Sequence, residues 1–133
     1  MEKDLPGKLL AELKTAAEPV KQQAIANVSP FSSKAAKAIR IASRGGRARP
    51  AVYIASGGKR APVGMPMENW GKAGTWRHPV FAVGATRGTW TGAWVEQTAH
   101  PHLYPALVST ADQVAENVGD VLVRFFEEHG WKG

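Results

Sequence analysis

The 133-residue sequence contains no cysteine, which excludes disulfide bonds, thiolate metal sites and cysteine nucleophiles. Long hydrophobic runs are also missing, so no segment of the sequence is predicted to cross a membrane. The first residues are mixed in charge and lack the apolar core of an export signal, so no export signal is expected. These absences favour a protein that is used, or assembled, in a cytoplasm.

Acidic residues are absent from residues 19–67, which hold nine lysines and arginines. Residues 97–133 have the opposite balance, with five acidic and two basic residues. The formal net charge of the whole chain is +6. A chain that is basic in its middle and acidic at its end can bind nucleic acid or a second copy of itself.

The composition that remains supports a folded core. Hydrophobic residues make up 44% of the chain, which argues against wholesale disorder. A chain of this length buries roughly two-thirds of the surface that its unfolded form exposes. We therefore interpret residues 1–133 as a single domain.

Helical spacing of apolar residues is present near both ends of the chain. From Leu9 to Val28 they recur at three- and four-residue steps, and Pro19 is predicted to kink or restart this helix. A second stripe from Leu107 to Phe125 predicts a C-terminal amphipathic helix. Pro105 suits its first turn, and Gly130 is predicted to stop it.

Between these helices, alternating apolar residues predict short strands. Residues 37–43 and 50–56 flank a glycine turn and predict a β-hairpin, and residues 79–83 and 89–97 predict two further strands. Residues 57–78 are rich in glycine and proline and predict an extended loop, functional or ordered by a partner. The predicted fold class is α+β, with the helices against a small antiparallel sheet.

No residue pattern in the sequence is typical of an active site. His100 and His102 lack a third ligand that would complete a metal set, so loop or packing roles are favoured. Residues 56–59, SGGK, resemble a phosphate loop only superficially, because Arg60 stands where Ser or Thr is needed. Since no nucleophile–base set can be named, we expect neither an enzyme nor a cofactor.

The basic stretch allows more than one interpretation. Its lysines and arginines are interleaved with Ala, Ile and Gly rather than aromatic residues, so contact with phosphates is favoured over base stacking. A small nucleic-acid-binding domain built on residues 34–60 is therefore one possible function. The alternative is a solvated hairpin edge, where positive charge blocks unwanted strand pairing.

Five tryptophans are many for a chain of this size. Four of them lie in the glycine-rich middle of the chain, at positions Trp70, Trp76, Trp90 and Trp94. Tryptophan is enriched at binding hot spots because it combines a large apolar area with one polar atom. We expect about half of these side chains in the core and the others at an interface.

One set of motifs runs through the second half of the chain. It comprises MENWG at residues 67–71, GTWRHPVF at 74–81, WVEQ at 94–97, HP at 100–101 and PAL at 105–107. This pattern resembles the tail-completion, or neck, proteins of long-tailed bacteriophages, and the resemblance covers roughly residues 5–128. Its most specific part is the WRHPVF segment followed by Trp-Val-x-Gln.

The resemblance implies a structural virion protein rather than an enzyme. Proteins of this kind are α+β subunits of a ring, usually six-fold, that lies between the head-closure (stopper) protein and the tail terminator. Genomic DNA passes through the ring, which is part of the virion and is assembled in the host cytoplasm.

For a subunit of such a ring, we expect two sets of functional residues. The basic residues expected to face the DNA channel or an interface are Lys34, Arg44, Arg47 and Arg49. The residues expected at the interface between subunits are Trp70, Trp76, Arg77, His78, Phe81 and Trp94. The basic middle and the acidic last helix supply a candidate pair of complementary surfaces for neighbouring subunits.

Overall fold

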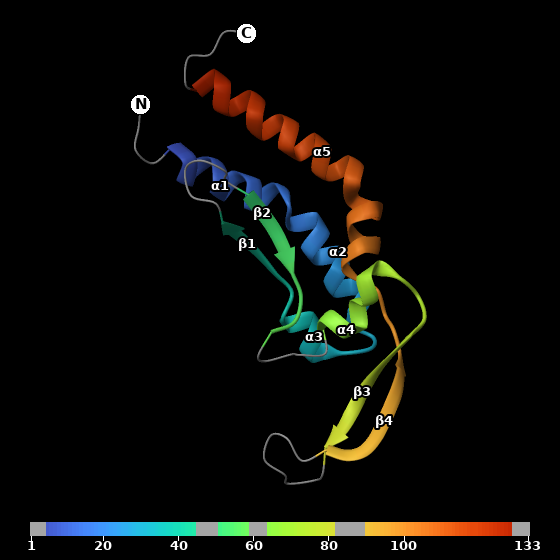
Figure 1. Ribbon diagram of the computed structural model, residues 1–133. Coiled ribbons are helices and arrows are strands. Elements are labelled where there is room, and N and C mark those ends of the chain that lie inside the picture. The colour runs from blue at the N-terminus through green and yellow to red at the C-terminus, as the bar shows by residue number, and fades with distance from the viewer. Residues whose placement is uncertain (1–4, 45–50, 59–63, 82–89, 129–133) are drawn as a thin grey trace.

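The computed structural model describes residues 5–44, 51–58, 64–81 and 90–128, and its fold is α+β, as the sequence predicts (Figure 1). The helices are α1 (Leu5–Ala16), α2 (Glu18–Val28), α3 (Ser33–Lys37), α4 (Gly64–Glu68), the 3-10 turn η1 (Asn69–Gly71) and α5 (Leu103–Glu128). The strands are β1 (Arg40–Arg44), β2 (Ala51–Ala55), β3 (Thr75–Phe81) and β4 (Trp90–Thr98).

The N-terminal helix is broken at the proline, as the sequence predicts. Pro19 is the second residue of α2, where a missing N–H costs no helical hydrogen bond. A separate short helix, α3, begins after Ser32, whose Oγ accepts a hydrogen bond from the Ala35 N–H at 3.1 Å.

The core lies between α2, α3 and the start of α5. Its buried members are Val20, Ala24, Val28, Ala35, Ala36, Ile39, Met67 and Ala106. Most of these side chains are small, so the helices approach closely, and α5 packs along both α1 and α2 (Figure 1). The predicted C-terminal helix is confirmed, with Pro105 in its first turn, while Gly130 lies outside the described residues.

The single small sheet expected from the sequence is wrong, because the strands form two separate antiparallel pairs. The predicted first hairpin is confirmed as β1 and β2, in which Ile41 pairs with Ile54, but its first strand begins at Arg40 rather than at residue 37, because Lys37 is the last residue of α3. In the second pair, β3 and β4, Arg77 lies opposite Glu96 and Pro79 opposite Trp94. Figure 1 shows this second hairpin extending away from the helices.

The extended loop predicted over residues 57–78 is also corrected, since α4, η1 and the start of β3 lie within it. A close tertiary contact explains the difference. A Cβ on Gly64 would lie 2.7 Å from the Gly57 nitrogen and 2.8 Å from Ser56 Oγ, so only glycine allows α4 to begin here. No local sequence signal anticipates that packing.

No helix in the described part of the chain is both long and apolar enough to span a bilayer.

Candidate assembly surface and the network that positions it

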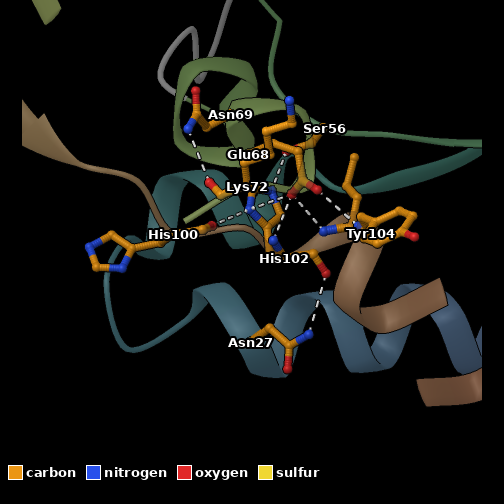
Figure 2. Close-up of polar contacts among 9 residues, drawn as sticks. Asn27, Ser56, Glu68, Asn69, Lys72, His100, His102 and Tyr104 are labelled. Atoms are coloured by element: carbon orange, nitrogen blue, oxygen red, sulfur yellow. Dashed lines mark hydrogen bonds and ion pairs between the residues drawn. The ribbon is translucent and has the colours of Figure 1, made fainter. Parts of the chain in front are cut away.

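Three polar side chains from separate parts of the chain meet in the interior (Figure 2). Ser56 follows β2, Glu68 ends α4, and His102 precedes α5. The Ser56 Oγ lies 2.8 Å from His102 Nε2, and His102 Nδ1 lies 3.2 Å from Glu68 Oε2. The imidazole of His102 therefore joins the end of the first hairpin to the junction of α4 and α5.

The Glu68 carboxylate caps the N-terminus of α5. Its Oε2 accepts hydrogen bonds from the backbone N–H groups of His102 at 2.6 Å and Leu103 at 2.7 Å, and its Oε1 accepts one from Tyr104 at 2.9 Å. These N–H groups have no partner within the helix, and the helix dipole favours a negative charge beside them. One buried carboxylate thus holds α4 and η1 against the start of α5.

The order of contacts from serine to histidine to glutamate is that of a catalytic relay, but its surroundings favour a structural role. Ser56 is 4% exposed and His102 is fully buried. Gly64 packs directly over the Ser56 hydroxyl, where a substrate carbonyl would have to lie. The carboxylate is also engaged by three backbone donors, as a helix cap is.

Directly after Glu68, the backbone places Trp70 in solvent. Asn69 and Trp70 adopt φ values of 47° and 55°, the left-handed region that non-glycine residues rarely occupy. The turn is held by a hydrogen bond from Asn69 Nδ2 to the Lys72 carbonyl at 3.0 Å, and Gly71 lies against the Tyr104 ring. Trp70 is 90% exposed, so a strained backbone is maintained around a large apolar side chain that the chain leaves uncovered.

The long helix α5 carries apolar residues on two faces. One face, which includes Ala106 and Val121, is buried against α1 and α2. A second row follows the outer face at steps of three, four and seven residues, and its members are all exposed. We call this row the α5 stripe: Tyr104, Val108, Ala111, Ala115 and Leu122.

A row of acidic side chains starts at the edge of the α5 stripe, where Asp112 follows Val108 by four residues, and turns away from the stripe along the helix. Asp112, Glu116 and Asp120 are four residues apart, which places them on one face of the helix, and all three are exposed. An exposed apolar row beside charged side chains on the same helix is typical of a protein-binding surface rather than of a solvated helix.

An apolar groove of about 520 Å³ lies between the first hairpin and α5. Its walls include Val52 and Tyr53 from β2, Trp70 from η1, and Tyr104 and Leu107 from α5. Tyr104 therefore belongs both to this groove and to the beginning of the α5 stripe.

The predicted interface residues on the second hairpin do not gather at this groove. Trp94 is 50% exposed, and the Arg77 guanidinium lies 5.5 Å from the centre of its ring. His78 is half-buried, with its ring 5.2 Å from that of Trp76, and Phe81 is the last residue of β3.

Trp76 has a different environment from Trp70 and Trp94. Its ring packs against the core, and its buried Nε1 has no hydrogen-bond partner among the described residues. The role of Trp76 at an interface stays a prediction. Its packing against the core indicates that it also contributes to the stability of the fold.

Two of the four predicted basic residues lie among the described residues. Lys34 is exposed on α3, and the guanidinium of Arg44, at the end of β1, lies 5.7 Å from the centre of the Tyr53 ring. Arg47 and Arg49 lie outside the described residues.

Sequence reasoning missed the contacts among Ser56, Glu68 and His102. They lie up to 46 positions apart, and no spacing rule relates them. The one local signal is Glu68 at the end of a short helix in an otherwise glycine-rich segment. His102 does have the packing role that the sequence favours over metal binding.

Within the described ranges, no group of three His, Cys, Asp or Glu side chains could hold a metal ion. Comparisons with protein-family models, curated proteins and solved structures find no match to this chain. The interpretation of function therefore rests on the residues and their geometry.

Proposed function

We propose that this protein is a structural, non-enzymatic subunit of the neck of a long-tailed bacteriophage. Its copies form a ring, six-fold by preference, that joins the head-closure protein to the tail terminator around the DNA channel. The motifs between residues 67 and 107 support this role through their resemblance to neck proteins.

The observation that carries the proposal is the amount of large apolar surface that one copy leaves exposed. Trp70 is 90% exposed, Val108 60% and Tyr104 59%, and they belong to neighbouring elements, η1 and α5. Large apolar side chains exposed on neighbouring elements are typical of a surface that a partner covers. A ring subunit covers such a surface with its neighbour and needs no cofactor to do so.

The basic side chains suit a channel for DNA. Contacts from lysine and arginine to phosphates are independent of base sequence, as a channel through which a whole genome passes requires. In this proposal part of the set formed by Lys34, Arg44, Arg47 and Arg49 faces the lumen, and the rest contacts neighbouring subunits.

The test is to find the protein in purified virions by mass spectrometry and then to determine the neck structure by cryo-electron microscopy. A ring of this chain between head and tail is the expected result and would show which basic side chains line the channel. Absence from the particle would overturn the proposal. Tight, salt-dependent binding of bare duplex DNA by the free monomer would then favour the nucleic-acid-binding alternative.

A further inference from the structure

We infer that the α5 stripe of one copy packs on the outward face of the β1–β2 hairpin of a second copy. The inference rests on the proposed ring and names the contact between its subunits. It commits to a second copy of this chain as the occupant, because the charge and shape of two surfaces on the same chain are complementary.

The outward face of the β1–β2 hairpin follows from its register. Tyr53 pairs with Ala42, and Arg44 with Ala51, so these side chains share one face of the two-stranded sheet. The neighbouring residue Ile54 points the other way and packs against the core. Arg44 and Tyr53 are exposed, which leaves a basic and aromatic face open for contact.

The charges on the two surfaces are opposite. The helix that carries the α5 stripe also carries Asp112, Glu116 and Asp120, and Asp112 lies at the edge of the stripe, four residues after Val108. The hairpin face carries Arg40 and Arg44, and all five side chains are exposed. Residues 19–67 contain no acidic side chain that would repel the acids of α5. Opposite potentials favour this pairing and disfavour the packing of two α5 helices, whose acidic rows would repel each other.

The shapes also match. Ala111 and Ala115 form a shallow stretch in the middle of the α5 stripe, between the larger side chains of Val108 and Leu122. The flat ring of Tyr53 is 43% exposed on a hairpin face whose other residues include Ala42 and Ala51, so it can enter such a depression.

Tyr53 and Tyr104 line the same groove within one copy, but they remain 43% and 59% exposed, so the two surfaces do not bury each other within one chain. Each copy then offers its α5 stripe to one neighbour and its hairpin face to the other. A contact between two different surfaces is head-to-tail, and it closes into a ring when the rotation per subunit divides a full turn.

The first experiment measures self-association of the full chain by light scattering coupled to size exclusion. Val108→Asp and Leu122→Asp place a charge in the α5 stripe and are expected to weaken self-association at least about tenfold. Far-UV circular dichroism and the melting temperature should stay near wild type, because both side chains are already exposed. A variant that loses its fold is replaced by Ala111→Asp, at an exposed position of the same row.

The second experiment reverses the charges. Arg44→Glu and Asp112→Lys should each weaken self-association at least about tenfold, and the two together should restore most of it. Lys72→Glu is the matched control for Arg44→Glu, because it changes the net charge equally at an exposed position outside both surfaces. It should leave self-association unchanged.

Wild-type chain that remains monomeric at the highest attainable concentration overturns this inference, as does failure of the two charge reversals to compensate. Neither result bears on whether the protein is in the virion, which mass spectrometry decides separately. A neck ring in which the α5 stripe contacts another surface would likewise overturn the inference and leave the proposed function intact.

Discussion

Glu68 shows how much one buried side chain organises in this protein. It is 6% exposed, and it contacts the imidazole of His102 and three backbone N–H groups at the start of α5. Two residues later the chain reaches the strained turn at Trp70. The position of Trp70, the most exposed aromatic side chain among the described residues, thus depends on a carboxylate that solvent barely reaches.

Replacing Glu68 with alanine should therefore destabilise the fold strongly. The substitution leaves the backbone N–H groups of His102, Leu103 and Tyr104 without their acceptor, at a cost of about 3 kcal/mol in the free energy of unfolding, while the His102 ring keeps its contacts with Ser56 and the His100 carbonyl. Urea denaturation followed by circular dichroism measures the change. Glu116→Ala, at an exposed position on α5, is the control and should change stability by less than about 0.5 kcal/mol.

Trp70 and Trp76 should respond differently to substitution. Trp70→Gly relieves a positive φ and removes an exposed ring, so stability should stay equal or rise by up to about 1 kcal/mol while assembly weakens. Trp76→Ala removes a half-buried ring that packs on the core and should cost about 2 kcal/mol. Thermal melting measures the stability of both variants, and light scattering measures their assembly.

Loss of stability in Trp70→Gly would contradict the assignment of Trp70 to an assembly surface.

At the scale of elements, α5 differs from a simple amphipathic helix. One apolar face is buried against α1 and α2, and the α5 stripe lies on the outer side. Gly119 interrupts this 26-residue helix at an exposed position where an added Cβ would meet nothing within 4 Å. Glycine inside a helix loses more conformational entropy on folding than alanine does, so Gly119 lowers the stability of α5 relative to alanine at the same position.

Gly119→Ala should stabilise the protein by roughly 0.5–1 kcal/mol, because alanine favours the helical backbone and fits the space. Differential scanning calorimetry should show a higher melting temperature. Gly71→Ala is the matched control, and it is expected to have the opposite effect on stability. Gly71 has a φ of 76°, and a Cβ there would lie 2.7 Å from the Tyr104 Cβ, so this variant should be destabilised by more than about 1 kcal/mol.

At the scale of the whole molecule, positive and negative charge are separated between the β1–β2 region and α5. Residues 19–67 carry only basic charged residues, and the exposed acids of α5 lie in another part of the fold. This separation favours head-to-tail association and gives it a dependence on salt.

Self-association of the wild-type chain should therefore weaken by roughly tenfold when salt rises from about 0.05 to about 0.5 M. Sedimentation equilibrium at several salt concentrations measures the change. The Arg44→Glu and Asp112→Lys double variant should keep a similar dependence, since it restores opposite charges with their positions exchanged. Association that strengthens with salt would indicate an apolar contact without the proposed charge pairing.

The fold could be predicted from the sequence where periodicity is local. The break at Pro19, the first hairpin and the long C-terminal helix follow from the spacing of apolar residues and from the chemistry of proline and glycine. The helix α4 could not be predicted, because its start depends on the contact of Gly64 with Ser56 and Gly57. The division into two sheets was missed for the same kind of reason, since pairing partners are chosen by tertiary packing.

By itself, the sequence determined the α+β class, the positions of its main helices and first hairpin, and the separation of charge along the chain. These properties depend on residues within about four positions of one another along the chain, or on the amino-acid composition of a segment. Only the tertiary structure decided that Glu68 and His102 form a buried cap, that Trp76 packs on the core, and that Trp70 is exposed. Burial depends on which distant segments meet, and the spacing of residues along one segment does not specify that.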